Sequence, residues 1–250
     1  QVSASVSVNS ESAQFTEGEG VFIVNDSGLA GILSGSIDLK VGPVDAGGRV
    51  GLRINNTGGS VSETVTFKKN DLLINFDQGN VFDVSVSDLS LNIGDFVWIS
   101  GDIAFSEESP ITVHDVNGQK QNVEMTSFAG NGLEIFWGQG PARLDDGSLN
   151  PLATGALLSD ASVGILKYGE KYALNATGTI SMLGVNGVTI EGAANVRFND
   201  TGYKIDKEIS ILNSNKDPIE VKFDEVDIPD DLKEKVDELR EQVVETAAEA

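Results

Sequence analysis

The chain has 250 residues, a formal net charge of −22, one His and no Cys. Its length allows a sizeable apolar core, but the lack of Cys excludes thiol nucleophiles, disulfides and thiolate metal sites. The negative charge would repel a phosphate backbone, which argues against a nucleic-acid partner, and no apolar run approaches the roughly 18 residues that a membrane span needs.

Strand-like alternation begins at the N-terminus and continues to about residue 223. In the first such stretch Val2, Ala4, Val6 and Val8 alternate with serines, and residues 82–93 alternate in a similar way. Alternation with a period of two, broken by Gly, Asn, Asp and Ser, is typical of antiparallel strands with one polar face. We therefore expect residues 1–223 to form an all-β body. It would be an elongated, mostly antiparallel β-rich repeat architecture, in the form of a sandwich, a solenoid or a flattened barrel.

One sequence segment of this body recurs further along the chain. LRINNTG returns as VRFNDTG at an offset of about 144 residues. Asn and Gly both accept left-handed backbone angles, so the pattern N-x-T-G predicts a turn that closes a strand. Arg53 and Arg197 precede these turns, and alternation places them on the outer face of their strands. The repeat is present about 1.7 times, which favours a body of stacked copies.

An acidic amphipathic helix is predicted for residues 224–250. Its apolar side chains form one stripe, which contains Leu232, Val236, Leu239 and Val243. Pro229 and the acidic residues after it suit the first turn of a helix. Because a lone helix of about 20 residues is marginal in water, we expect the stripe to dock on the sheet or on another chain.

The body is similar in style to a known kind of protein. Residues 84–105 and 150–179, together with the two N-x-T-G strand ends, resemble repeats of very long, Cys-free, acidic, secreted microbial surface proteins of the adhesin-like type. The resemblance implies a structural or adhesive role outside the cell, and it implies no active site. The predicted helix departs from that pattern, because it stands where the next repeat strands would follow.

Two turns concentrate oxygen ligands. One contains Asp115 and Asn117, and the other contains Asp145, Asp146 and Asn150. Neither has the later Glu of an EF-hand loop. Calcium is the candidate ion at both turns, and the alternative is a solvated turn in which Asp and Asn shape the backbone. We expect no other cofactor, because the sequence has no P-loop and no dinucleotide-binding motif.

Four N-glycosylation sequons provide candidate modification sites, at Asn25, Asn55, Asn175 and Asn199. Two of them are the Asn of the N-x-T-G turns. Their presence therefore has a second explanation in turn chemistry, and glycan attachment depends on a secretory setting that carries it out.

Aromatic residues offer a different kind of contact. Alternation places Phe96 and Trp98 on one face, and Phe136 and Trp137 on opposite faces. The tryptophans could stack on a sugar, and core packing is the alternative. His114, the only histidine, has an acidic neighbour, but the sequence has no nucleophile-elbow motif whose serine it could activate. We therefore expect no enzymatic activity.

These patterns predict a non-enzymatic structural protein, secreted to the extracellular space or the cell surface. Its copies would join head to tail into a filament, sheath or layer through the N-terminal strand and the C-terminal helix. A strand added to the open sheet edge of the next copy supplies such a contact, and head-to-tail contacts that do not close build an open assembly. The alternative is an adhesive or carbohydrate-binding module of a larger cell-surface repeat protein, stiffened by calcium, with surface glycans as partners.

Overall fold

The structure is a computed structural model that describes residues 2–8, 11–67, 70–94, 96–115, 119–144, 146–184 and 190–224. Every regular element in these ranges is a strand. They are β1 (Val2–Val8), β2 (Glu11–Asn25), β3 (Gly28–Val41), β4 (Val44–Asn55), β5 (Val61–Phe67), β6 (Asn70–Phe76), β7 (Asn80–Ile93), β8 (Val97–Asp115), β9 (Lys120–Gln139), β10 (Thr154–Tyr168), β11 (Lys171–Leu183), β12 (Glu191–Asn199), β13 (Tyr203–Ile209) and β14 (Ile219–Phe223). The predicted all-β class is confirmed.

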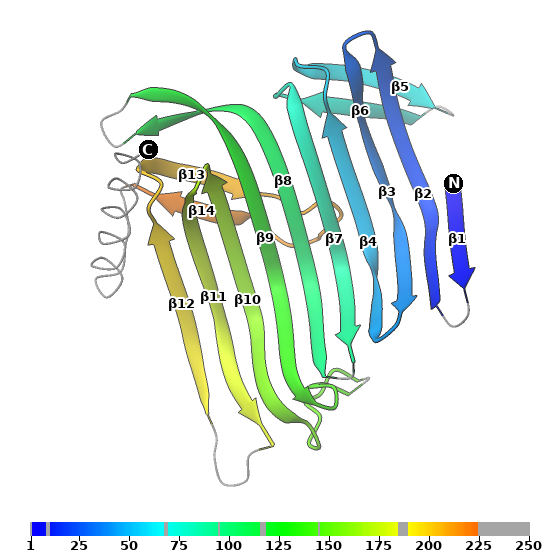
Figure 1. The fold of residues 1–250 in the computed structure, drawn as a ribbon, viewed down its shortest axis with the longest axis vertical. Coiled ribbons are helices and arrows are strands. Elements are labelled where there is room, and N and C mark those ends of the chain that lie inside the picture. Colours follow the sequence, from blue (N-terminus) through cyan, green and yellow to red (C-terminus); the bar gives the residue numbers. More distant parts are fainter. Residues whose placement is uncertain are drawn as a thin grey trace, which may run out of the picture.

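One large sheet dominates the molecule. Its strands follow the order β1-β2-β3-β4-β7-β8-β9-β10-β11-β12, and each pairs antiparallel with its neighbour (Figure 1). Tight turns join many of the neighbours. Between β10 and β11, for example, Gly169 has a φ of 61°, an angle that glycine adopts without a steric penalty. The antiparallel arrangement predicted from alternation is confirmed.

The β5–β6 hairpin leaves the sheet between β4 and β7, and the β13–β14 hairpin follows the last strand, β12, with the start of β13 pairing to the end of β8. Both hairpins lie on the same face of the sheet (Figure 1). Under the first hairpin, Ile74 and Phe76 pack with Ala30 and Val81 of the sheet. Under the second hairpin, a larger cluster contains residues of the four strands β8, β9, β10 and β11 and of the hairpin itself. Val221, at the centre of this cluster, is fully buried. A third cluster joins Phe136 and Leu157 to Ala142 and Ala153 of the loop between β9 and β10. The apolar cores are therefore local, one beneath each hairpin and one beneath this loop.

The N-x-T-G pattern builds the same turn twice. Asn199 is fully buried, and its Oδ1 accepts hydrogen bonds from Thr201 N at 3.1 Å and Thr201 Oγ1 at 2.7 Å. The Oδ1 of Asn55 accepts the equivalent bonds from Thr57 at 3.1 and 2.8 Å. Each turn closes a sheet strand, as predicted, and leads into the hairpin that folds back over the sheet.

The expectation that the two arginines lie on an outer face holds for Arg197, which is exposed, but not for Arg53, which is half-buried beneath the β5–β6 hairpin. The guanidinium of Arg53 lies 5.0 Å from the ring centre of Phe76, and that of Arg197 lies 4.5 Å from the ring centre of Phe223. Each also donates to a backbone carbonyl of the same hairpin, Arg53 to Asn75 O and Arg197 to Lys222 O. The arginines point away from their apolar neighbours, as alternation requires, and lie on the face that carries the hairpins.

A series of β-bulges crosses the middle of the sheet. Glu17, Asp88 and Asp160 have φ angles of 55°, 52° and 51° and lie at register shifts in β2, β7 and β10. At the bulge of β7 the backbone N–H of Asp88 donates to Asp102 Oδ1 at 2.8 Å. The other oxygen of Asp102 accepts a bond from Ser214 Oγ at 2.5 Å, so that this bulge is connected to the β13–β14 hairpin.

The predicted C-terminal helix, with Leu232, Val236, Leu239 and Val243, lies outside the described residues. In the part of the chain that the structure describes, no helix is long and apolar enough to cross a membrane.

Candidate functional site

The predicted assembly strand forms one border of the sheet. β1 pairs with β2 of its own chain over Ala4 to Val8 and at Val2, and within the described residues no strand pairs with its other side. Val6 and Val8 are 65% and 61% exposed. The unpaired side of β1 is therefore an open sheet edge, the kind of edge to which another strand can add.

The opposite border is β12, whose only described sheet neighbour is β11. Because the sheet is an antiparallel series of ten strands, β1 and β12 run in opposite directions. A second copy, shifted sideways without rotation, would therefore place its β1 antiparallel to this β12. It would also keep the same face of the sheet on the same side.

The aromatic residues divide between the two faces, and the prediction for one pair is wrong. Trp98 packs on Phe136 at 5.6 Å between ring centres, whereas Phe96 contacts Trp137 edge to face at 5.9 Å. Phe136 and Trp137 are neighbours in β9 and point to opposite faces, as predicted. Phe96 and Trp98 therefore do not share a face, because Phe96 lies in the turn before β8, where strand alternation does not apply.

The described members of the candidate calcium turns use their polar atoms within the turn. Asp146 Oδ1 accepts bonds from Ser148 Oγ at 2.6 Å and Ser148 N at 2.9 Å, and these bonds lower the pKa of Asp146. Asn150 Nδ2 donates to Pro141 O, and its Oδ1 accepts from Leu152 N.

The remaining calcium candidates, Asp145, Asn117 and the side chain of Asp115, lie outside what the structure describes. The described residues contain no group of three or more acidic or His side chains that could hold a metal ion. His114 is exposed at the end of β8, where its backbone pairs with Lys204 of β13.

The four sequons differ in exposure. Asn55 and Asn199 are 1% and 0% exposed, and their Nδ2 groups donate to backbone carbonyls. Asn175 is half-buried and donates to Glu220 O, whereas Asn25 is exposed at the β2–β3 turn. A glycan on either N-x-T-G asparagine would break the turn of the folded chain.

A polar cavity of about 300 Å³ lies between the sheet and the β13–β14 hairpin. The sequence patterns did not indicate it, because its charged groups come from four strands that are distant in the chain. Its polar lining includes Arg53, Asp83, Ser106, Glu108, Ser127 and Lys207.

The charges of this cavity are paired with one another. Arg53 lies 2.9 Å from Asp83, and Lys207 Nζ lies 3.0 and 3.1 Å from the two oxygens of Glu108. Burial raises the pKa of Asp83, although the hydrogen bond from Ser106 and the charge of Arg53 oppose the shift. Raised carboxyl pKa values occur at catalytic sites, but here both oxygens of each carboxylate already accept bonds. These groups hold β13 and β4 in place.

The face of the sheet opposite the hairpins is apolar across its whole width, and we call it the apolar face. Two rows of paired residues, one on each side of the bulges, show this. The upper row is Gly20, Leu33, Leu52, Val84, Phe105, Phe128, Ile165, Leu174 and Phe198. The lower row is Val6, Ala13, Leu39, Ala46, Leu91, Ile99, Ile135, Leu158, Ile180 and Gly192.

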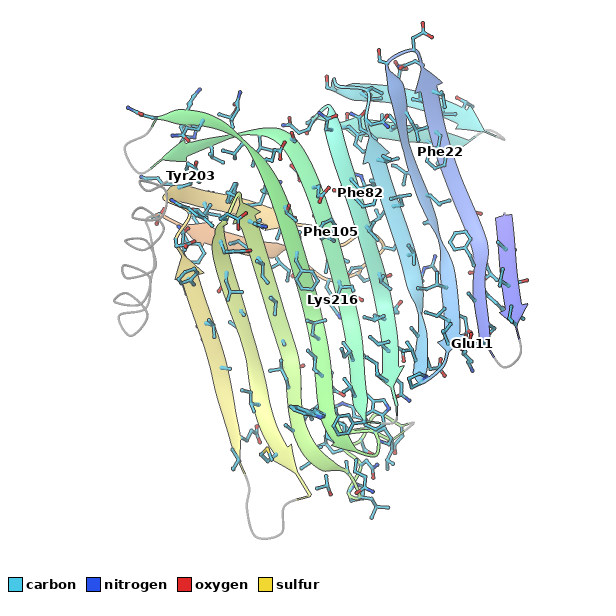
Figure 2. The ribbon with its side chains drawn as sticks, in the orientation of Figure 1. Glu11, Phe22, Phe82, Phe105, Tyr203 and Lys216 are labelled. Atoms are coloured by element: carbon cyan, nitrogen blue, oxygen red, sulfur yellow. The ribbon has the colours of Figure 1, made fainter. Side chains whose placement is uncertain are left out.

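Nothing in the described part of the chain covers the apolar face. Phe22, Phe82 and Phe105 lie on it and are 44%, 40% and 37% exposed, and the hairpins lie on the far side of the sheet (Figure 2). Ile180 and Val196 are 46% and 49% exposed near the β12 border. The alternation of apolar and polar residues in the sequence predicts an apolar face. It does not predict that this face is uncovered, because the apolar side of an alternating strand is normally buried.

Comparison of the chain with protein-family models, with curated proteins and with solved structures finds no match.

Proposed function

We propose that the protein is a non-enzymatic extracellular structural subunit whose copies join head to tail into a filament, sheath or layer. The observation that supports this most directly is the pair of open edges, β1 and β12, at the two borders of one antiparallel sheet. Their opposite directions make them complementary, since a shifted copy extends the ladder with antiparallel pairing. Such a heterologous contact does not close and builds an open assembly.

The composition supports the same proposal. The chain has no Cys and one His, and the carboxylates of its polar cavity are held by Arg53 and Lys207. In this proposal the predicted helical stripe with Leu239 contributes a second contact between copies, and the surface charge keeps single subunits soluble before they meet.

Negative-stain electron microscopy with a matched size-exclusion run, with and without millimolar calcium, tests the proposal. We expect regular filaments, ribbons or sheets from the intact chain. Deleting residues 1–9 should abolish long assemblies, because it removes the strand that adds to the next copy. Dispersed particles from the intact chain, or undisturbed assemblies from the truncated one, would refute the proposal.

A second candidate function is an adhesive or carbohydrate-binding module, and one observation favours it. Trp137 is 61% exposed and stands edge to face against Phe96, which is 51% exposed. Exposed aromatic rings of this kind can stack on sugars. This function predicts saturable glycan binding that Trp137→Ala abolishes, with Leu152→Ala, an exposed residue of the nearby loop, as the control. A flat glycan-array response would eliminate it.

A further inference from the structure

We propose that the apolar face binds the apolar face of a second copy of this chain, so that two sheets pack face to face. This deepens the proposed structural function and rests on it for the identity of the partner. The edges would extend a sheet sideways, whereas the apolar face would join two such sheets into a double layer.

The size of the face is the first argument. Ten strands spaced about 4.8 Å apart and extending for about 40 Å give a face of roughly 2,000 Å². A stable interface needs about 800 Å² from each partner, and exposed apolar patches on monomers rarely exceed about 600 Å². The face is therefore large enough for a stable interface and too large to be ordinary surface.

Residues 225–250 are too few to cover it. Even as one continuous helix, 26 residues would be about 39 Å long and 10 Å wide, or roughly 400 Å². The described chain also leads into them from β14, on the opposite side of the sheet. A helix of that size would cover about a fifth of the face.

The flat shape of the face is complementary to another flat sheet. A side chain at Gly31 would meet the ring of Phe22 at 2.2 Å, and one at Gly35 would meet the ring of Phe15 at 2.3 Å. The aromatic rings therefore lie down over glycines of the neighbouring strand. Flat apolar sheets pack in this way about 10 Å apart with their strands nearly aligned.

Charge favours a protein partner over a lipid surface. The net charge is −22, and the charged side chains on the face are few: Glu11 pairs with Val8 at the β1 border, and Glu107 lies in one row with Phe82 and Lys167. Anionic membranes attract basic margins and repel acidic ones. A second copy adds only the same small number of charges.

The central test uses one charge placed in the middle of the face. Phe105 is 37% exposed, so a lysine there can keep its charge in water in the single chain, but pairing would bury the added charge. Thr177→Lys, at an exposed position on the hairpin side of β11, is the matched control. In sedimentation of the chain without residues 1–9, in which a neighbouring copy could offer β12 only β2, a strand that runs parallel to it, we expect dimers for the parent and the control and monomers for Phe105→Lys.

A thiol probe keeps the test decisive if the lysine variant does not fold. The chain has no Cys, so Phe105→Cys and Thr177→Cys each introduce a single thiol. We expect maleimide labelling of Phe105→Cys to slow at least tenfold as protein concentration rises, and labelling of Thr177→Cys to stay fast.

Each outcome separates face pairing from edge assembly. Fast labelling at every concentration would overturn the face-to-face inference, even if the intact chain forms long ribbons. Slow labelling in a monomer would show that the chain covers its own face, and monomers that bind neutral phosphatidylcholine vesicles would show a lipid occupant; both also overturn it. Dimers without ribbons from the intact chain would retain face pairing and refute edge assembly.

Discussion

At the scale of single residues, Asp102 connects the bulge of β7 to the β13–β14 hairpin. It is 4% exposed, and its carboxylate accepts bonds from Ser214 Oγ and Asp88 N while Lys216 Nζ lies 3.4 Å away. Burial alone would raise its pKa, but the two hydrogen bonds and the charge of Lys216 lower the pKa below the ordinary 3.8. The ionised form therefore stabilises the fold.

The pH dependence follows from the direction of that shift. A carboxyl whose pKa is lower in the folded chain stabilises it above pH 3.8 and loses this effect as the pH falls through the folded value. We expect Asp102→Asn to lower the free energy of unfolding by about 2 kcal/mol at pH 7, and by less at pH 3, which lies below the ordinary carboxyl pKa of 3.8. Urea unfolding at both pH values measures the difference.

Asp38→Asn is the control for that prediction, because Asp38 is exposed on β3 and its replacement removes the same formal charge. It should change stability by less than about 0.5 kcal/mol. An Asp102→Asn deficit of the same size at both pH values would show that the carboxylate charge is not what stabilises the connection.

At the scale of elements, close backbone approach holds the β13–β14 hairpin on the sheet. A side chain at Gly164 would place its Cβ 2.5 Å from Val221 Cγ2 and 2.9 Å from Ile219 Cγ2. The hairpin can lie this low only because β10 has a glycine beneath it. Arg197 of β12 also lies over the ring of Phe223 in β14.

We expect Gly164→Val to lower the free energy of unfolding by about 1–3 kcal/mol, because the valine forces the hairpin outward. Limited proteolysis should cut residues 210–218 earlier than in the parent. Gly192→Val is the matched control, since a Cβ at Gly192 meets nothing within 4 Å. Equal stability of the two variants would indicate that the hairpin is not packed as tightly as the contacts imply.

Alternation predicted the strands, their antiparallel pairing and the ends of β4 and β12, because period-two burial and turn chemistry are local properties. It did not predict which face the hairpins cover. Alternation predicts that Arg53 faces solvent, but its guanidinium lies over the ring of Phe76. That contact depends on the path of the chain after the N-x-T-G turn. The apolar face and the polar cavity need the register of distant strands, which bulges such as that at Asp88 adjust. The 144-residue repeat stays a prediction at the level of whole units.

At the scale of the whole molecule, charge repulsion opposes apolar association. Copies that carry a net charge of −22 repel one another, and the apolar face and open edges must outweigh that repulsion. In the proposed assembly, this balance would set the conditions under which subunits associate.

Salt should shift this balance toward assembly. Raising the ionic strength from 0.01 M to 0.15 M shortens the screening length from about 30 Å to about 8 Å. We expect the assembled fraction, measured by sedimentation at fixed protein concentration, to rise severalfold, with the same trend for sodium chloride and potassium chloride. Assemblies that dissolve as sodium chloride is added would show that ion pairs, rather than strand pairing and apolar contact, hold the copies together.

The uneven spacing of β4 and β12, the two strands that lead into the hairpins, has a consequence for diffraction. β4 and β12 are six positions apart in a ten-strand sheet, or about 29 Å apart in a repeat of about 48 Å. These two strands therefore divide each subunit unequally, into about 29 Å and 19 Å. A fibre pattern from aligned ribbons would show the strand reflection near 4.8 Å, together with a layer line near 48 Å from the subunit repeat.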